Sequence, residues 1–589
     1  MTGSAPLTVS ALVAVAVTTV VIGAYGVRLS RTTSDFLVAS RSVGARWNAA
    51  AIAGEYLSAA SFLGVAGLIA KFGADALWFP VGFTAGYLGL LLFVAAPLRR
   101  SGAYTVPDFA EFRLGSTRLR GVTTAIVVLI CLLYLVPQYQ GAGLTLAIVL
   151  GAPTWVGAVA VAAIVTANVV GGGMRSITFV QGFQFWLKLT AIAVPAVVLA
   201  GAFVADQRTL GDPAPPVLAE RTTVDIRTDV VVQVATTQPV VVDGVASTLV
   251  AGRHEFAAGT TVVFEAGAVT PVVDGAPGSD ADWLRPGNGF GGGHPTYQVY
   301  SLIVALFLGT MGLPHVLVRF YTNPEGQAAR ATALAVIGLV GLFYLFPIGL
   351  GVLARSYLPQ LMITGTSDAA VLLLPGAAFG GVVGRLLAAL VAAGALAAFL
   401  STSSGLLVTA AAVLSTDLLP GRVRDFRVAA VIGGSVPVAL SLSVDSLDVS
   451  RTVGLVFAVA ASTLCPLLLL GIWWRGLTVT GAAAGLVVGG GSAAAATTVA
   501  ALGGPSDLVA GGWPAAILGY PAAVTVPLSF GVMVLVSRFD RRRVPLDVVR
   551  TFARMHAPER IGMGVDRLAR IDRSSQRNDR SSHARRRRM

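Results

Sequence analysis

Four consecutive hydroxyl side chains, Ser401 to Ser404, interrupt an otherwise apolar stretch that reads GALAAFLSTSSGLLVTAA. If the stretch is a helix, Ser401 and Thr402 follow Ala398 by three and four residues, so both hydroxyls lie near the same face as its carbonyl. Two hydroxyls and one carbonyl make half of an oxygen cage, and hard cations such as Na⁺ prefer oxygen ligands. The alternative is that each hydroxyl donates to the carbonyl one turn earlier in its own helix.

Polar and charged side chains also interrupt two further apolar stretches. Glu55 lies in the middle of one of them. In the other, Gln181, Gln184 and Lys188 have the spacing i, i+3, i+7, which places them on one face of a helix. A charge in such a segment is costly and is usually functional or paired. Lys188 is expected either to snorkel or pair structurally, or to line an inner ion or anion path. Glu55 is expected to exchange a proton, to balance a cation or to cap free N–H groups at a helix break.

These residues belong to a chain with the composition of a membrane protein. The 589 residues are 55% hydrophobic and only 12% charged, with a mean hydropathy of +0.77. Apolar stretches of about 20 residues, each able to cross a hydrocarbon core of about 30 Å, recur along nearly the whole chain. They predict thirteen transmembrane helices, at residues 7–29, 47–69, 77–98, 121–150, 154–170, 177–203, 299–320, 331–353, 385–416, 428–443, 452–474, 480–502 and 517–536.

Arginine predicts the orientation of these helices. Arginines gather in alternate loops, beginning with the loop after the first helix, and in the C-terminal tail. The positive-inside rule therefore places the N-terminus outside and the C-terminus in the cytoplasm. From Arg538 to Met589 there are sixteen arginines and six acids. A basic run beside a membrane contacts anionic lipid more often than nucleic acid, so lipid is the expected partner of the tail and no nucleic acid is expected.

Two of the predicted helices are interrupted near their middle. The sequence GEY at residues 54–56 interrupts the first, and Gly309, Gly312 and Pro314 interrupt the second. Glycine and proline weaken or remove helical hydrogen bonds that lipid cannot replace, so such breaks persist where they line a cavity or bind something. The two helices are five positions apart in order, and paired breaks of this kind point to the midplane site of a transporter. The alternative is two kinks packed against neighbouring helices.

Residues 205–296 differ from the rest of the chain. They combine Pro, Gly and Asp with short alternating runs such as TVDIRTDVVVQV and TTVVFEAG, which are typical of strands joined by turns. They predict a small β-rich insert outside the membrane. The predicted division is an extra helix with a cytoplasmic loop (1–46), a first repeat (47–204), the insert (205–296), a second repeat (297–476), two further helices (477–538) and a basic tail (539–589).

Four motifs resemble those of a known family. DFLVASRSVGARWNAAAIAGEYLSAASFLGVAG, GAYTVPDFAEFRLG, GTMGLPHVLVRFYT and FAVAAST are similar to segments of the sodium:solute symporter family and, within it, of the cation/acetate symporters (acetate permease). The resemblance covers nearly all of residues 35–538, apart from the insert and details of the last two helices. It implies an all-α polytopic membrane protein with the leucine-transporter fold, in which ten core helices form two inverted repeats of five.

The resemblance also implies a sodium site. In the family, two backbone carbonyls at the first break, and one carbonyl and two hydroxyls from a later helix, bind the ion. The matching residues are Gly54, Leu57, Ala398, Ser401 and Thr402. Members that carry two sodium ions use a hydroxyl near Ser404 and an aspartate where this chain has Gln181, so one ion per cycle is expected.

Substrate contacts are expected at both breaks and on the facing helix at residues 121–150. The candidates are Tyr56, Ser61, Gln138, Met311, Gly312 and His315. His315 is equally suited to bind a carboxylate and to make a packing hydrogen bond. An acid at the position of Glu55 matches the acetate-type branch, because proline-type members carry theirs one position later.

The sequence therefore predicts a symporter that couples the entry of a short monocarboxylate such as acetate to Na⁺, by alternating access, in the inner membrane of a bacterium. The residues expected in its ion path or gate are Glu55, Gln181, Gln184, Lys188 and Ser404. The alternatives are a symporter of proline or another organic acid, and a nutrient sensor on a transporter scaffold. An enzyme is disfavoured because the five histidines are scattered and the sequence has no H-E-x-x-H, G-x-S-x-G or P-loop pattern.

Overall fold

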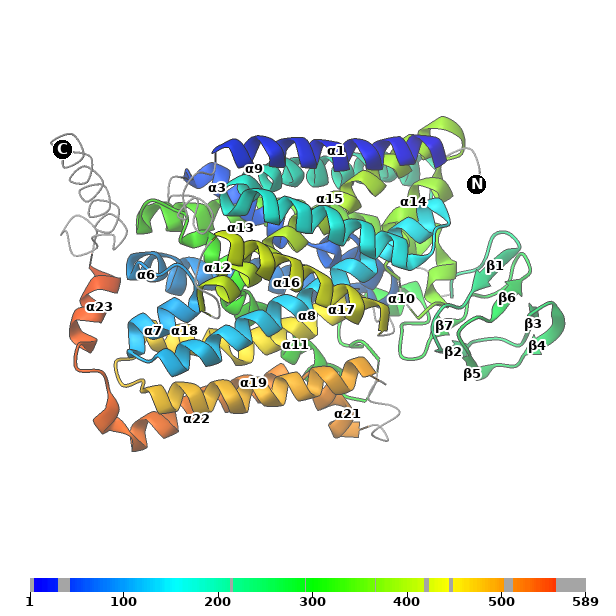
Figure 1. Cartoon of the computed structure of the whole chain (residues 1–589). Helices are drawn as coiled ribbons and strands as arrows, with labels where there is room; N and C mark the ends of the chain where they lie inside the picture. The colour runs from blue at the N-terminus through cyan, green and yellow to red at the C-terminus, as the bar shows by residue number, and fades with distance from the viewer. Residues whose placement is uncertain are drawn as a thin grey trace.

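The computed structural model describes residues 5–29, 43–211, 215–291, 293–365, 367–417, 423–443, 449–502 and 512–557. Long helices form a bundle with a small β-rich part at one end (Figure 1). The start of α1 (Ala5–Leu29) lies at the same end as the β-rich part, and α23 (Val548–His556) lies at the opposite end. The arginine-rich residues 558–589, with their predicted lipid contact, lie outside the described residues.

The helices before the insert surround the first break. They are α3 (Ala45–Tyr56), the π-helix η2 (Ala60–Gly64), α4 (Val65–Phe72), η3 (Gly73–Leu77), α5 (Trp78–Gly89), η4 (Leu90–Val94), α6 (Ala95–Ser101), α7 (Val106–Leu114), α8 (Thr117–Leu150) and α9 (Thr154–Ala205). The side chains of residues 48–72 are all buried, so α3, η2 and α4 form the centre of the bundle.

The helices after the insert contain the second break. They are α11 (Pro295–Gly312), α12 (Pro314–Phe320), α13 (Gly326–Tyr357), η5 (Pro359–Met362), α14 (Ala370–Ala378), α15 (Gly381–Asp417), α16 (Val423–Ser443), α17 (Val449–Ser462), α18 (Leu464–Trp473), α19 (Val479–Leu502), α21 (Gly512–Gly519), α22 (Ala522–Phe539) and η6 (Arg541–Arg543). α15, which carries the four hydroxyls, packs extensively against α9 and α8.

Within the described residues, ten helical runs are long and apolar enough to cross a membrane, or up to eleven when α11 and α12, which meet at 43°, count as one span. Two of the ten correspond to more than one predicted helix: Thr154–Ala205 includes 154–170 and 177–203, and Ala60–Ser101 includes 77–98 and the end of 47–69, whose beginning is α3. They are divided at Gly73 (φ +62°) and Gly173 (φ +57°), backbone conformations that suit glycine. Each predicted helix therefore lies at least partly in one of these runs or in the bent pair α11 and α12.

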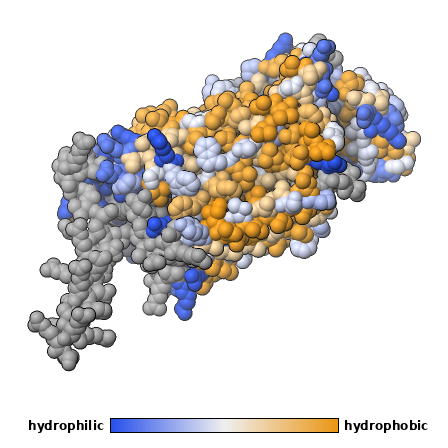
Figure 2. Space-filling model, turned by 90° about the horizontal axis from the view of Figure 1, so that it is seen from above, coloured by the Kyte–Doolittle hydropathy of each residue, from blue (hydrophilic) through white to orange (hydrophobic). Residues whose placement is uncertain are grey.

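Apolar side chains cover the sides of the bundle. α1 exposes Val13, Val17 and Val21, and α13 exposes Leu334 and Leu345. Figure 2 shows an apolar middle with hydrophilic residues gathered toward the two ends. A surface of this kind matches the apolar core and the polar boundaries of a bilayer. The chain is a multi-pass membrane protein.

The insert is β-rich, as predicted. Its elements are β1 (Thr222–Asp225), β2 (Val230–Val234), β3 (Gln238–Val242), β4 (Val245–Leu249), β5 (Gly252–Phe256), β6 (Thr261–Phe264), β7 (Val272–Val273) and the short helix α10 (Asp280–Trp283). One antiparallel sheet has the order β1-β6-β3-β4 and the other has the order β5-β2-β7. Val232, Val262 and Phe264 are fully buried in a small apolar core of the insert.

The last part of the insert is joined to the end of the first broken helix. Trp283 is buried, and its Nε1 donates to Ile69 O in α4 over 2.7 Å. Asp75 accepts hydrogen bonds from the backbone N–H groups of Gly287 and Gly289 over 2.9 and 2.7 Å. This segment therefore covers one end of α4.

Candidate functional site

The first break separates α3 from η2. α3 ends at Tyr56, and Leu57 leaves helical geometry (φ −72°, ψ 84°) before the π-helix begins at Ala60. Such a break frees backbone groups that a continuous helix would pair internally. The N–H group of Ala59 donates to Gln138 Oε1 over 3.1 Å. Because the segment is buried, the freed groups need partners from the protein or from a ligand.

Lys188 of α9 reaches into the first break. Its Nζ donates to Gly54 O, to Leu57 O over 2.6 Å and to Ser401 Oγ over 2.9 Å. Ser401 Oγ also lies 2.7 Å from Gly54 O and 3.1 Å from Ala398 O. An ammonium group has three donors and no acceptor, so these three oxygens satisfy it.

The structure thus brings the predicted sodium ligands together and places an ammonium group among them. Gly54, Leu57 and Ser401 contact Lys188 directly. The hydroxyl of Thr402 donates to Glu55 O over 2.6 Å. A sodium ion would need the oxygens that Lys188 already uses, and two cations repel each other strongly in a dry site. With Lys188 in this position, the residues do not fit a sodium ion.

Glu55 pairs with an arginine that the sequence analysis did not single out. Nε of Arg319, in α12, lies 2.6 Å from Glu55 Oε2, and both side chains are buried. Arg319 also donates to Thr178 Oγ1 over 2.7 Å and to Gln181 Oε1. Gln181 Nε2 in turn donates to Ser401 O over 2.8 Å. One signal in the sequence pointed to Arg319: an acid inside an apolar helix needs a base, and Arg319 lies inside the predicted helix at 299–320.

The other predicted ion-path residues, Gln184 and Ser404, do not lie together. Gln184 turns toward α1, where its Nε2 donates to Thr19 Oγ1 over 3.2 Å, and not toward the break. Ser404 is buried in α15. Ser403 is buried beside it, and its hydroxyl has no hydrogen-bond partner among the described residues. Of the polar stripe on α9, only Gln181 and Lys188 therefore reach the first break.

The second break lies between α11 and α12. Leu313 is extended there (φ −71°, ψ 115°). Gly312 packs against the backbone of α17, where an added Cβ would lie 2.5 Å from Ala460 O. Met311 packs against Gly89, so that an added Cβ on that glycine would lie 2.5 Å from the methionine sulfur. Gly312 and Met311, both predicted substrate residues, therefore have packing contacts in this conformation.

Two predicted substrate residues already have hydrogen-bond partners. The hydroxyl of Tyr56 lies 2.9 Å from Phe83 O and 2.9 Å from Thr310 Oγ1. The hydroxyl of Ser61 lies 2.8 Å from the hydroxyl of Tyr344. These bonds join the first broken helix to α5, α11 and α13.

Besides Glu55 Oε1 and the Ser403 hydroxyl, three buried side chains near the breaks have polar atoms without a hydrogen-bond partner among the described residues. These atoms are both ring nitrogens of His315, Nε2 of Gln138 and the hydroxyl of Tyr87. Aromatic rings adjoin them: Tyr134 lies edge-on to His315 with ring centroids 5.4 Å apart, and Tyr56 lies 4.8 Å from Tyr87. Buried polar groups are rarely left unpaired, so these atoms mark a place for a polar ligand. Tyr87 and Tyr134 were not predicted, because nothing in their spacing relates them to the breaks.

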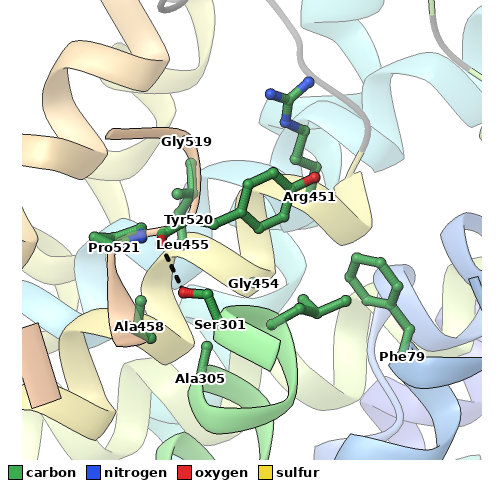
Figure 3. Close-up of a pocket in the computed structure, with 12 residues that line it drawn as sticks. Phe79, Ser301, Ala305, Arg451, Gly454, Leu455, Ala458, Gly519, Tyr520 and Pro521 are labelled. Carbon is green, nitrogen blue, oxygen red and sulfur yellow. Dashed lines mark hydrogen bonds between the residues drawn. The ribbon is translucent and has the colours of Figure 1, made fainter. Parts of the chain in front are cut away.

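A pocket lies at the insert end of α11 (Figure 3). Phe79, Ser301 and Tyr520 are among its lining residues, and Ser301 Oγ donates to Tyr520 O over 2.6 Å. None of the predicted substrate residues lines it. The ring of Phe79 lies 6.2 Å from that of Phe83, which lies 6.1 Å from that of Tyr56. The pocket is therefore separate from the breaks, with aromatic rings between them.

Comparisons with known proteins agree with this architecture. A family model described as the sodium:solute symporter family matches residues 36–210 and 231–489. The chain is 29% identical over 480 residues to an uncharacterized symporter, YwcA, of Bacillus subtilis, covering 79% of this chain and 81% of the relative. It is 31% identical over 525 residues to a monocarboxylic acid transporter of Corynebacterium glutamicum, covering 85% of this chain and 86% of the relative.

A solved structure has the same fold. It is the substrate-bound outward-open state of a Na⁺-coupled sialic acid symporter, with a TM-score of 0.63 and 12% sequence identity. The match covers 90% of this chain and 98% of that chain. The predicted leucine-transporter fold is confirmed.

Proposed function

The chain belongs to the sodium:solute symporter family, and from this premise we propose that it carries a short monocarboxylate such as acetate by symport with a cation. Family and relatives make it a transporter of a small molecule and not an enzyme. The 31% identity to a monocarboxylic acid transporter supports the substrate class. The acid at position 55 supports acetate over proline, because the proline-type members of the family carry their acid one position later, where this chain has Tyr56.

The charge at the first break is the observation that carries this proposal. Lys188 and Arg319 are both basic and Glu55 is acidic, so this buried cluster has one formal positive charge in excess. A buried charge without a counter-charge is strongly unfavourable. A monocarboxylate anion brings one negative charge to the cluster, whereas a zwitterion such as proline brings none.

The unpaired atoms of the Gln138, Tyr87 and His315 side chains suit a carboxylate. A carboxylate only accepts hydrogen bonds. The amide of Gln138 and the hydroxyl of Tyr87 offer donors, and His315 offers one in its neutral form. The aromatic rings of Tyr56 and Tyr134 provide an apolar surface for the methyl group of acetate. A short carboxylate therefore matches both the polar and the apolar parts of the site.

Transport by alternating access requires this closed site to open to each side in turn. We propose that the pocket of Figure 3 belongs to the outer path, and that the rings of Phe79 and Phe83 move when the site opens toward it. We also propose that the insert end faces outward and α23 faces the cytoplasm of a bacterium. The placement of the insert and α23 at opposite ends supports this orientation (Figure 1).

Uptake of labelled acetate into proteoliposomes tests the proposal. Unlabelled acetate and propionate are expected to compete in large excess. Acetamide, which has nearly the shape of acetate but no charge, is not expected to compete, and neither is proline. Folded protein that takes up proline but not acetate, or that is inhibited by acetamide as strongly as by propionate, would overturn the proposed substrate class.

A further inference from the structure

We propose that the ammonium group of Lys188 is the resident cation of the first break, so that transport uses no sodium ion at this site. The proposal rests on the transport function proposed above and concerns the cation of the same site. It departs from the sequence, which predicts a sodium ion among Gly54, Leu57, Ala398, Ser401 and Thr402.

The first argument is the coordination of the ammonium group. Its acceptors are two carbonyls of the broken helix, at Gly54 and Leu57, and the hydroxyl of Ser401 on α15. These are oxygens of the type and origin that the predicted sodium site requires. The side chain of Lys188 is fully buried, and three oxygens accept from its three donors. Lys188 therefore joins α9 to α3 and α15, as a bound ion would join α3 to α15.

The second argument is the close packing that delivers Lys188 to the break. α3 and α9 touch through their backbones, because an added Cβ on Gly54 would collide with the carbonyl of Gln181. Lys188 lies two turns after Gln181 on α9, and its side chain bridges the remaining distance to Leu57 O. The glycine at position 54, which is still helical in α3, thus permits the close approach of α9.

The third argument is the charge balance. Arg319 already pairs with Glu55 Oε2 at 2.6 Å and so balances the charge of that carboxylate, although Glu55 Oε1 has no hydrogen-bond partner among the described residues. A sodium ion added beside Lys188 would be a second positive charge without a counter-charge in a site that excludes water. Like charges in such a site repel strongly. Binding of the ion and the present position of Lys188 therefore exclude each other.

Replacing sodium tests the proposal on the wild-type protein. Initial acetate uptake into proteoliposomes is measured in Na⁺ and in N-methylglucamine at equal ionic strength and pH. The two rates are expected to differ by less than about twofold. Stimulation by Na⁺ of about tenfold or more, equivalent to about 1.4 kcal/mol, would show that a sodium ion is used and would overturn the proposal.

Heat stability in detergent provides a test that does not depend on acetate. Na⁺ is not expected to stabilise the wild-type protein. It is expected to stabilise Lys188→Ala, because the vacated oxygens are then free to bind the ion and a ligand that binds the folded state stabilises it. Equal stabilisation of both proteins by Na⁺, or none of a folded Lys188→Ala variant, would contradict the proposal.

Lys71 supplies a matched control. It is also a buried lysine that donates to two backbone carbonyls, Thr364 O over 3.0 Å and Gly365 O over 2.8 Å, but at the insert end. Lys71→Ala is expected to gain no response to Na⁺. If the folded wild-type protein takes up no acetate in either Na⁺ or N-methylglucamine, the proposed function fails. In that case the role of Lys188 is still decided by heat stability, measured for the wild type and Lys188→Ala with and without Na⁺.

Discussion

The two helix breaks differ in what surrounds them. At the first, Lys188 and Ser401 bind the freed carbonyls, and the buried pair of Glu55 and Arg319 lies beside them. At the second, Leu313 turns the chain between α11 and α12, and the break packs against the backbone of α17. Charge and hydrogen bonds hold the first break, whereas close packing holds the second.

This difference indicates a division of labour between the halves. At the first break, donors from α9 and α15 already use the carbonyls of Gly54, Glu55 and Leu57, whereas Glu55 Oε1 has no hydrogen-bond partner among the described residues. The second break lies beside His315, whose ring nitrogens have no partner among the described residues. A ligand that accepts hydrogen bonds is therefore expected at the side of the site that faces His315 and Gln138, with the first break supplying the positive charge.

The largest effect is expected from removing one member of the buried ion pair. Arg319→Ala leaves Glu55 without its partner in a dry site, which costs about 3–5 kcal/mol. We expect little folded protein and no measurable uptake. The measurement is the monomer peak in size-exclusion chromatography after heating the protein in detergent.

A double variant separates the charge from the packing. Glu55→Gln combined with Arg319→Met removes both charges and keeps similar volumes, and replacing a buried pair in this way is often nearly neutral for stability. The double variant is expected to recover much of the monomer that Arg319→Ala loses. If Arg319→Ala is as heat-stable as the wild type, the first break does not depend on this ion pair.

A smaller effect is expected from crowding the second break. Gly312→Ala places a methyl group 2.5 Å from Ala460 O, a backbone atom that cannot turn away. Overpacking of this kind costs about 1–3 kcal/mol, so we expect lower heat stability and slower uptake. Gly349→Ala is the matched control, because no atom lies within 4 Å of its added Cβ. Equal stability of the two variants would mean that packing does not hold the second break.

The next effect concerns the ligand side of the site. Gln138→Leu removes the unpaired Nε2 donor but also the acceptor for Ala59 N–H, so the KM for acetate is expected to rise about tenfold or more. Thr145→Val on the same helix is the control, since its hydroxyl donates to Gly141 O within α8. An unchanged KM in Gln138→Leu, measured in proteoliposomes, would move the substrate away from α8.

Sequence patterns located the second break and came within a few residues of the first, but they did not predict the partners of either break. Gly312 and Pro314 flank the extended Leu313, so the second break lies where the sequence predicts it. The predicted interruption at residues 54–56 is wrong in position, because these residues are still helical in α3 and the chain leaves helical geometry at Leu57. The spacing of Gln181, Gln184 and Lys188 predicted that they lie on one face of one helix. It did not predict which helices pack against that helix. Gln184 contacts α1 and Lys188 contacts α3 and α15, which depends on how α9 packs between them.

Long-range pairs show the same limit. Arg319 and Glu55 are 264 residues apart, and Tyr134 meets His315 across two helices, α8 and α12. No local periodicity relates such residues. The resemblance to a sodium-binding family supplied the five cage residues, but it could not show that a lysine from α9 lies among them.

The smallest effect is expected at Thr402, and it sharpens the comparison most directly. Its hydroxyl donates to Glu55 O over 2.6 Å. Thr402→Val keeps the shape of the side chain and removes that one hydrogen bond, a loss of about 1 kcal/mol. Heat stability should fall slightly, and acetate uptake should stay insensitive to the replacement of Na⁺ by N-methylglucamine. If Thr402 instead binds sodium, uptake will require the ion, and its half-saturating concentration will rise about tenfold or more in the variant.

Ser403→Ala is the control, because the buried Ser403 hydroxyl has no partner among the described residues and its removal breaks no bond there. A small loss in Thr402→Val, none in Ser403→Ala and a flat sodium response in both would mean that Thr402 supports the backbone of the first break and that the cation there is part of the chain.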